Sequence, residues 1–345
     1  MPALTRRHFL AAASAASAAA LALPAGASAS PWGGVADRAR ALEQCHALAI
    51  RFRGEDVLAE AFRGPAIGRP VPVKSVSKSV VGALTGAALD RGEIASLDAT
   101  LGELAPRLIP AGADPRVAAL TVEQLVTMQM GLERTSGANY GGWVSSRDWV
   151  ANALSRPFVA EPGGGMLYST GAFHVLGAVL SEVSGESLLA LARTRLGQPL
   201  GIEIPPWTRD PQGRFMGGNE MALSVPAMLR FGEMYRLGGR WGERQVLSPD
   251  WVAQSLRPRT RSPFSGLDYG LGWFVGRSQG ERFLLARGFG GQVICVVPGL
   301  ELTVALTSDP NRPARSVGHF GDIMALIEGA ILPAARAEAG RVREG

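Results

Sequence analysis

Ser75 and Lys78 stand three residues apart at the start of an apolar stretch, VPVKSVSKSVVGALTGAALDRGEI, which covers residues 71–94. Residues at this spacing on a helix share one face, so the two side chains can meet. A serine hydroxyl becomes a good nucleophile when a neighbouring base removes its proton. A lysine in a dry cleft can be that base, because desolvation lowers its pKa. The pair therefore predicts acyl transfer through Ser75 with Lys78 as general base.

The stretch that carries this pair is predicted to be a buried helix from Ser75 to Arg91, since apolar residues recur at helical spacing and a glycine follows. The positive end of the helix disfavours the Lys78 ammonium and places the Ser75 N–H beside a developing oxyanion. Ser77 and Ser79 lie on other faces and are expected to be solvated or structural. Because S-x-x-K is frequent by chance, the assignment needs support from the rest of the chain.

Strand-like segments lie near both ends of the chain, and helix-like segments lie between them. We predict a helix at Ala36–Cys45, two strands in residues 46–64, further strands after about Asp250 and a last helix at Gly318–Ala335. In the middle, Thr121 and Gln124 form a candidate capping box before LVTMQMGL. This order predicts an α+β fold: an antiparallel sheet built from both termini, flanked by N- and C-terminal helices, with a mostly helical inserted part and a cleft between the two.

The first 29 residues have the pattern of an export signal. Arg6 and Arg7 precede an Ala-rich apolar run that ends in small residues at Ala27–Ala29, which is typical of a twin-arginine-type signal peptide. A retained membrane anchor is the alternative, although the run is short and Ala-rich for a span of ~20 apolar residues. We therefore expect a periplasmic or secreted protein with no stable membrane span after signal removal.

The charges of the chain give little support for a nucleic-acid partner. The formal net charge is +5, and loss of Arg6 and Arg7 with the signal lowers it to +3. The remaining basic residues are scattered and form no dense run, so nucleic-acid binding is not expected.

The few cysteines and histidines indicate neither a metal site nor a histidine-based triad. Cys45 and Cys295 are compatible with one disulfide in an oxidising compartment or with two buried thiols. His46, His174 and His319 have no acidic neighbour in the sequence and no metal-ligand spacing. No metal and no cofactor is expected.

Several segments resemble the serine β-lactamase and penicillin-binding-protein superfamily, especially its class C-like hydrolases. The nucleophile segment of that superfamily is similar to SVSKSVVGALTGAALDRGEIASLDATLGEL, and later landmarks are similar to LTVEQLVTMQMGL, PGGGMLYSTGAFHVLGAVLSEVSGESL, GGNEMALSVPAMLRFGEMYRLGGRWGERQVLSPDWV and YGLGWF, in the same order. The resemblance implies one hydrolase domain over residues 30–345, with an α/β part at about 36–75 and 250–340 and a helical part at about 76–249.

The resemblance implies roles for three side chains. Ser75 matches the acylated nucleophile, Lys78 its general base, and Tyr168 of the YST triplet the tyrosine that moves the proton between nucleophile, leaving group and water. The residue types agree, since a phenol near an ammonium is expected to have a lowered pKa and can act as a base. The alternative for Tyr168 is a half-buried aromatic residue with a bonded hydroxyl.

Two departures from the family pattern concern the substrate. Thr170 stands where class C β-lactamases have an asparagine that binds the β-lactam amide, which argues against efficient β-lactamase or peptidoglycan peptidase activity. The third family motif aligns with ARGFGGQ, residues 286–292, and lacks its usual Lys or His. In this register Gly288 lies at the strand edge and the Phe289 N–H is the second oxyanion donor beside that of Ser75, while a two-residue slip would assign Gly291.

Residues of two further segments are candidates for substrate contact. Arg287 either replaces the family lysine and binds a substrate carboxylate, or is a solvated strand arginine. In SGANYGGW, Tyr140 and Trp143 with Asn139 form a Gly-rich aromatic segment that is either a wall of the substrate pocket or an ordinary surface loop.

YST together with ARGFGGQ looks most like the branch that holds 6-aminohexanoate-dimer hydrolase and its carboxylesterase relatives. We therefore predict a serine hydrolase that cleaves an ester or amide of a small acyl substrate. The alternatives are a DD-peptidase or weak β-lactamase, and a non-catalytic module that binds peptidoglycan or acyl-peptides.

Overall fold

The computed structural model describes residues 30–344 of the chain. The predicted export signal, residues 1–29, lies outside the described residues. From Pro31 onward the chain clusters into one compact unit.

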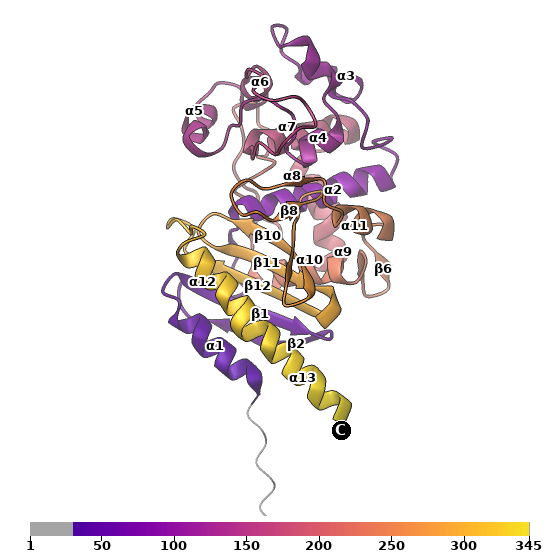
Figure 1. Cartoon of the computed structure of the whole chain (residues 1–345). Helices are drawn as coiled ribbons and strands as arrows, with labels where there is room; N and C mark the ends of the chain where they lie inside the picture. Colours follow the sequence, from indigo (N-terminus) through magenta and orange to yellow (C-terminus); the bar gives the residue numbers. More distant parts are fainter. Residues whose placement is uncertain (1–29, 345) are drawn as a thin grey trace, which may run out of the picture. The chain divides into compact units, whose positions relative to one another are not determined.

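Strands from both ends of the chain form one sheet, as the sequence predicted (Figure 1). Within residues 30–344 this sheet has eight strands in the order β2-β1-β12-β11-β10-β9-β8-β7, and each neighbouring pair is antiparallel. The N-terminal strand β1 thus lies beside β12, the last strand in the chain. The strands are β1 (Cys45–Phe52), β2 (Glu55–Ala61), β7 (Thr260–Arg261), β8 (Asp268–Tyr269), β9 (Phe274–Ser278), β10 (Glu281–Gly288), β11 (Gln292–Val297) and β12 (Leu302–Ser308).

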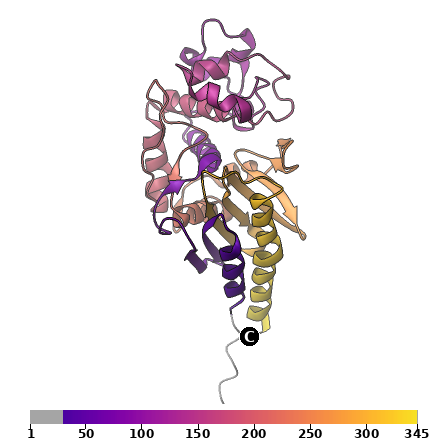
Figure 2. The ribbon, with the colours of Figure 1, turned by 90° about the vertical axis from the view of Figure 1, so that its left-hand side faces the viewer.

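Helices cover both faces of the sheet. On one face α1 (Pro31–Ala41) lies beside the C-terminal helices α12 (His319–Leu326) and α13 (Leu332–Glu344), as Figures 1 and 2 show. A π-helical turn, Ile327–Ile331, joins α12 to α13. The first helix ends earlier than predicted because Cys45 already begins strand β1 and pairs with Ser308 of β12.

The opposite face of the sheet is covered by α10 (Val225–Arg236). This helix lies within the segment, about residues 76–249, that was predicted to form the helical part. Its Gly232 lies so close to β11 and β12 that a Cβ there would be 2.6 Å from Ile294 Cγ2 and 2.9 Å from Thr303 Cγ2. The absence of a side chain at this position therefore brings the helix close to the sheet.

The remaining elements lie between β2 and β7, in and around the region for which the sequence predicted a mostly helical part, and most of them are helices. The capping box at Thr121 and Gln124 is confirmed, with both reciprocal hydrogen bonds present. The helices are α2 (Ser77–Asp90), α3 (Leu101–Leu104), α4 (Val122–Val126), α5 (Tyr140–Val144), α6 (Trp149–Leu154), α7 (Thr170–Ser184), α8 (Leu188–Ala192), α9 (Gln198–Leu200) and α11 (Pro249–Ser255). Short strand pairs are β3 (Val71–Pro72) with β4 (Ala222–Leu223) and β5 (Arg240–Trp241) with β6 (Arg244–Gln245).

Helix α2 is buried from Ser77 to Ala88. Two of its glycines allow close packing, since a Cβ at Gly82 would lie 2.9 Å from Leu271 O and one at Gly86 would lie 2.4 Å from the Trp251 ring. Because the helix is packed closely against Leu271 and Trp251, the position of the turn at its N-terminus is restricted.

The two cysteines are free and buried. They lie on β1 and β11, which are separated by β12, and their partners on β12 are Ser308 and Val304. Two strand spacings are about 10 Å, which exceeds the reach of a disulfide. Of the two alternatives, the structure therefore has two buried thiols.

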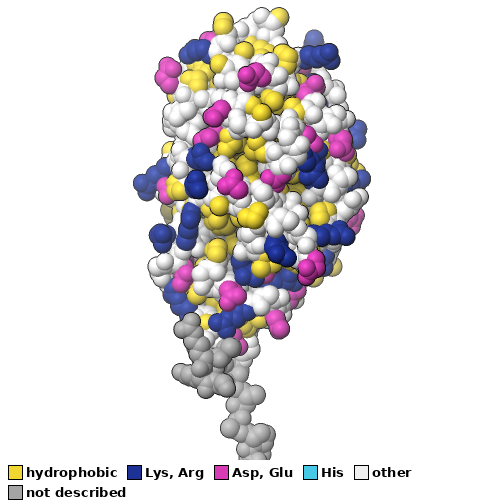
Figure 3. Space-filling view, turned by 90° about the vertical axis from the view of Figure 1, so that its right-hand side faces the viewer, with side chains coloured by type: hydrophobic (Ala, Val, Ile, Leu, Met, Phe, Trp, Pro, Cys, Tyr) yellow, Lys and Arg dark blue, Asp and Glu magenta, His cyan; other side chains and the backbone are white. Residues whose placement is uncertain are grey.

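On the face drawn in Figure 3, basic and acidic side chains are interspersed. Within residues 30–344 no single helix is long and apolar enough to cross a membrane; Thr170–Ser184 and Leu188–Leu200, bent by 86°, reach that length and composition only as a pair.

We expect Gly232→Ala to lower the free energy of unfolding by about 1–3 kcal/mol, because the added methyl group meets β-branched side chains of the sheet that have no room to move. The measurement is denaturant unfolding. The matched control is Gly34→Ala in α1, where no atom lies within 4 Å of the new Cβ, so an unchanged or slightly higher stability is expected. Equal stability of the two variants would show that α10 does not pack this tightly.

Candidate active site

Ser75 lies in a 3₁₀ turn, Lys74–Val76, that leads into α2, so the α-helix begins two residues later than predicted. Ser77 Oγ donates to Lys74 O (2.6 Å) and accepts from the Met221 N–H (3.2 Å). The turn is therefore tied both to itself and to the segment after residue 216. Of the two outcomes expected for the neighbouring serines, Ser77 and Ser79 are structural, since both are buried and Ser79 Oγ donates to Gly272 O.

The Lys78 amine lies beside the Ser75 hydroxyl in a buried position. Its Nζ is 3.1 Å from Ser75 Oγ, 3.3 Å from Thr170 Oγ1 and 2.7 Å from Gly218 O. Only 2% of the Lys78 surface is exposed. This burial lowers the pKa of the amine from 10.5 to about 7. A lysine that is largely neutral slightly above pH 7 can accept the proton of a serine.

Tyr168 is half-buried, and its ring lies beneath the lysine, with Nζ of Lys78 4.9 Å from the ring centroid. The predicted lowering of its pKa is wrong. Burial raises the pKa of the phenol, and the hydrogen bond with Ser75 and the charge of Arg287 oppose this only in part. The phenol is therefore neutral at pH 7, and Lys78 is the neighbouring group whose pKa is lowered toward 7.

Thr170, the first residue of α7, is joined to this group. Its hydroxyl contacts Lys78 Nζ and lies 3.0 Å from Ser136 Oγ, which also accepts from the Thr170 N–H at 2.9 Å. The threonine hydroxyl is thus held between a lysine and a serine.

The β10–β11 hairpin brings the third predicted motif to the turn that carries Ser75. A Cβ at Gly288 would lie 2.3 Å from Val73 O, so β10 touches the backbone just before the Ser75 turn. Phe289 lines the same cavity as Ser75. The Gly291 N–H donates to Gly288 O within the hairpin turn (3.2 Å), which leaves the first register, with Phe289, as the arrangement that the geometry favours.

Arg287 is not a solvated strand arginine. Its side chain is partly buried, its Cζ lies 3.7 Å from the Phe320 ring centroid, and it lines the cavity with Ser75 and Tyr168. No hydrogen bond or ion pair of this guanidinium is found within residues 30–344. The Arg287 guanidinium is therefore a positive charge on the cavity wall, without an acidic partner among the described residues.

The cavity has a volume of about 660 Å³. Tyr140 belongs to the cavity wall, and its hydroxyl accepts a hydrogen bond from Asn219 Nδ2 at 2.9 Å. The segment that carries it forms two short helical turns, Gly137–Asn139 and Tyr140–Val144, and is not an ordinary surface loop. Trp143, predicted to contact substrate, does not line the cavity. It is fully buried behind Tyr140 at a ring distance of 5.8 Å, because its indole N–H donates inward to Trp149 O.

Several wall residues were not predicted. Lys74 Nζ lies 3.0 Å from a carboxylate oxygen of Glu220, and both residues have positive φ, 52° and 66°. Lys74 directly precedes Ser75 in the sequence, but no sequence pattern predicts its contact with Glu220, which lies 146 residues further on. The other unpredicted wall residues are Ser136, Gly137, Asn219, Ser262, Phe264, Phe274, Pro310, Asn311 and Ala314.

No group of three His, Cys, Asp or Glu side chains arranged to hold a metal ion is found in the part of the chain that the structure describes. The titratable groups that meet at Ser75 are an amine and a phenol. This arrangement, a serine hydroxyl with an adjacent lysine of lowered pKa inside a cavity, is suited to nucleophilic acyl transfer.

The fold and this group of side chains define a class of protein, the serine hydrolases built on an antiparallel sheet with a helical insert. The profile of the β-lactamase family matches residues 47–323, and the chain belongs to that family. An esterase is among its relatives in sequence, and hydrolases are among the solved structures that it resembles.

Known relatives agree with this family. The chain is 31% identical to Esterase EstB of Burkholderia gladioli over a stretch that covers 45% of each chain, so it matches less than half of that relative's length. In structure it is similar to a protein described as a 6-aminohexanoate-dimer hydrolase from Bacillus anthracis (TM-score 0.72, 17% identity, 90% of this chain and 82% of that chain). It is also similar to EstCE1, a hydrolase with promiscuous acyltransferase activity (TM-score 0.71, 19% identity, 87% and 97%).

We expect the reaction of Ser75 with a fluorophosphonate to speed up as the pH rises through about 7 and to level off above it. The reason is that only the neutral Lys78 amine accepts the serine proton, and its pKa is about 7. The measurement is the labelling rate between about pH 5 and about pH 9, with labelled peptides identified by mass. Lys78→Ala is the control and should remove this step from the profile; an unchanged step in that variant would show that another group titrates.

Proposed function

We propose that this protein is a serine esterase or amidase that cleaves small acyl substrates through an acyl-enzyme on Ser75. The observation that carries the proposal is the Lys78 amine, buried and 3.1 Å from Ser75 Oγ. A desolvated amine at hydrogen-bond distance from a hydroxyl is what a serine needs to become a nucleophile near neutral pH.

In the acylation step, Ser75 Oγ attacks the substrate carbonyl carbon while Lys78 takes the hydroxyl proton. The carbonyl oxygen becomes an oxyanion that accepts hydrogen bonds from the backbone N–H groups of Ser75 and Phe289. When the C–O or C–N bond breaks, the leaving alcohol or amine receives the proton from Lys78 through the neutral Tyr168 phenol. The acyl group is then an ester of Ser75.

Deacylation repeats these movements with water as the nucleophile. Water adds to the acyl carbon and gives its proton to Lys78 through Tyr168, and the bond to Ser75 Oγ breaks. The proton returns to Ser75, and the carboxylic acid leaves. The position of the Tyr168 phenol, hydrogen-bonded with Ser75 and adjacent to Lys78, supports this relay.

The cavity wall supports a small substrate with an apolar part and a negative end. Phe264, Phe274 and Phe289 supply apolar surface, and Arg287 supplies a guanidinium suited to a carboxylate. Thr170, held by Lys78 and Ser136, offers no amide to a β-lactam. These features favour an ester or amide over a β-lactam or a peptidoglycan stem peptide.

We also propose that the protein is exported from the cytoplasm. The twin arginines and small-residue end of residues 1–29 support a periplasmic or secreted enzyme that meets substrates outside the cytoplasm.

The activity test compares p-nitrophenyl esters with nitrocefin, using the wild-type protein and Ser75→Ala. We expect ester turnover that Ser75→Ala loses by a factor of at least about 10³, and a fluorophosphonate adduct on the Ser75 peptide alone. Nitrocefin hydrolysis faster than every ester would favour a weak β-lactamase, and release of D-alanine from a stem peptide would favour a DD-peptidase. Stable ligand binding without adduct or turnover would instead favour a non-catalytic binding module.

We expect Arg287→Met to raise KM about tenfold for an ester with a carboxylate on its acyl chain, because a charge-assisted hydrogen bond to the guanidinium is lost. KM for a neutral ester of the same length should not change. Arg277→Met, an exposed position on the neighbouring strand β9, is the matched control. An equal change for both esters would mean that Arg287 does not recognise a carboxylate.

A further inference from the structure

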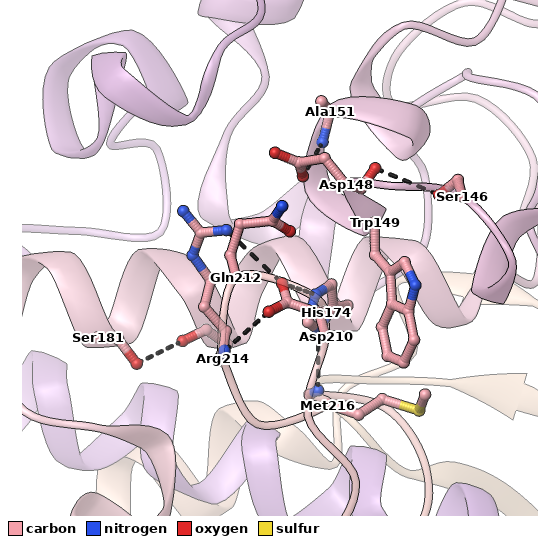
Figure 4. A network of polar contacts seen from close by, with 12 residues as sticks. Ser146, Asp148, Trp149, Ala151, His174, Ser181, Asp210, Gln212, Arg214 and Met216 are labelled. Carbon is pink, nitrogen blue, oxygen red and sulfur yellow. Dashed lines mark hydrogen bonds and ion pairs between the residues drawn. The ribbon is translucent and has the colours of Figure 1, made fainter.

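His174 and Asp210 form a buried polar pair behind the proposed catalytic group. His174 Nε2 lies 3.1 Å from Asp210 Oδ2, and both side chains are 0% exposed. Along the sequence His174 has no acidic neighbour, because Asp210 follows it by 36 residues and reaches it only through the fold. Figure 4 shows the two side chains facing each other between α7 and the 208–216 segment.

The hydrogen bonds fix which nitrogen of His174 carries the proton. A carboxylate only accepts, so Nε2 donates to Asp210. The other ring nitrogen, Nδ1, accepts from the Gly217 N–H at 3.3 Å. The neutral imidazole with its proton on Nε2 satisfies both bonds, and a proton on Nδ1 would break the bond with Gly217.

The next residue after Gly217 touches the general base. Gly218 O accepts a 2.7 Å hydrogen bond from Lys78 Nζ, the shortest of the three that this amine makes. The two glycines lie against α7, since a Cβ at Gly217 would be 2.1 Å from Phe173 O and one at Gly218 would be 3.0 Å from Thr170 O. The bond with His174 therefore helps to aim the Gly218 carbonyl at Lys78.

The pair itself is rigid. Asp210 Oδ1 accepts from the Arg214 N–H at 2.8 Å, and the Arg214 guanidinium lies 3.6 Å from Oδ2. The rings of Trp143 and Trp149 enclose His174 at centroid distances of 5.8 and 5.5 Å. Trp143, which does not line the cavity, therefore has a place in this supporting layer.

We propose that His174, oriented by Asp210, is a positioning residue that holds Gly217–Gly218 so that the Gly218 carbonyl directs the Lys78 amine at Ser75. This inference rests on the proposed function, in which Lys78 is the base. His174 does not line the cavity and is hydrogen-bonded to Asp210 and Gly217 rather than to Ser75, so it acts through two backbone groups, those of Gly217 and Gly218.

Two substitutions separate the two bonds of the imidazole. The carboxamide of His174→Asn ends where Nδ1 lies, so it retains an acceptor for the Gly217 N–H. The carboxamide of His174→Gln ends where Nε2 lies, so it keeps a donor for Asp210 and loses the bond with Gly217. We expect His174→Gln to lower kcat for p-nitrophenyl acetate about tenfold with little change in KM, and His174→Asn to recover most of that loss.

The pH profile distinguishes positioning from general damage. In His174→Gln the acid limb of the pH profile of kcat should move to lower pH. Lys78 loses a well-aimed carbonyl that stabilises its ammonium, and the pKa of the amine therefore falls. The matched control is Glu233→Gln on α10, since Glu233 is also buried and hydrogen-bonded, to Thr303 and Arg236, but does not line the cavity. It should lower the melting temperature without moving the acid limb.

A lowered kcat and shifted acid limb in His174→Gln, recovered in His174→Asn and absent in Glu233→Gln, supports the positioning role. Wild-type labelling at Ser75 with an unshifted limb in His174→Gln would overturn it and leave the proposed function intact. No labelling and no ester turnover in the wild-type protein would reject the proposed function itself, and the positioning role with it.

Discussion

A buried amine is the constraint on which the rest of the site depends. Lys78 is almost without solvent, and an isolated ammonium is costly in such a place. Its nitrogen contacts an oxygen from each of three separate segments: Ser75 on the 3₁₀ turn, Thr170 on α7 and Gly218 after the 208–216 segment. The burial that lowers its pKa and the three acceptors that orient it therefore both require the complete fold.

Close backbone contacts bring these segments together. Gly288 allows β10 to touch Val73, two residues before Ser75, and Gly217 allows the third segment to touch α7. Glycine is needed at such contacts because a side chain would overlap backbone oxygens. Ser77, with bonds to Lys74 and Met221, joins the same turn to the segment that carries Gly218. Ser75 and Lys78 are thus aligned by main-chain packing as much as by side chains.

Two layers of residues surround the proposed reaction. The inner layer faces the cavity and mixes aromatic side chains with Arg287, Lys74 and Glu220. The outer layer is buried and polar where His174 meets Asp210, and aromatic where Trp143 and Trp149 enclose the imidazole. In the proposed mechanism the inner layer contacts the substrate, and the outer layer supports the backbone segment that carries Gly218.

The sequence by itself determined what depends on local spacing and on the order of segments. It predicted the approach of Ser75 to Lys78, the capping box at Thr121, and a sheet assembled from both termini, since these follow from helical periodicity and strand patterns. It did not determine the state of Tyr168, because the raised pKa depends on burial by distant segments. Nor did it reveal the Lys74–Glu220 and His174–Asp210 pairs or the inward turn of Trp143, because contacts between residues far apart in the chain exist only once the segments pack.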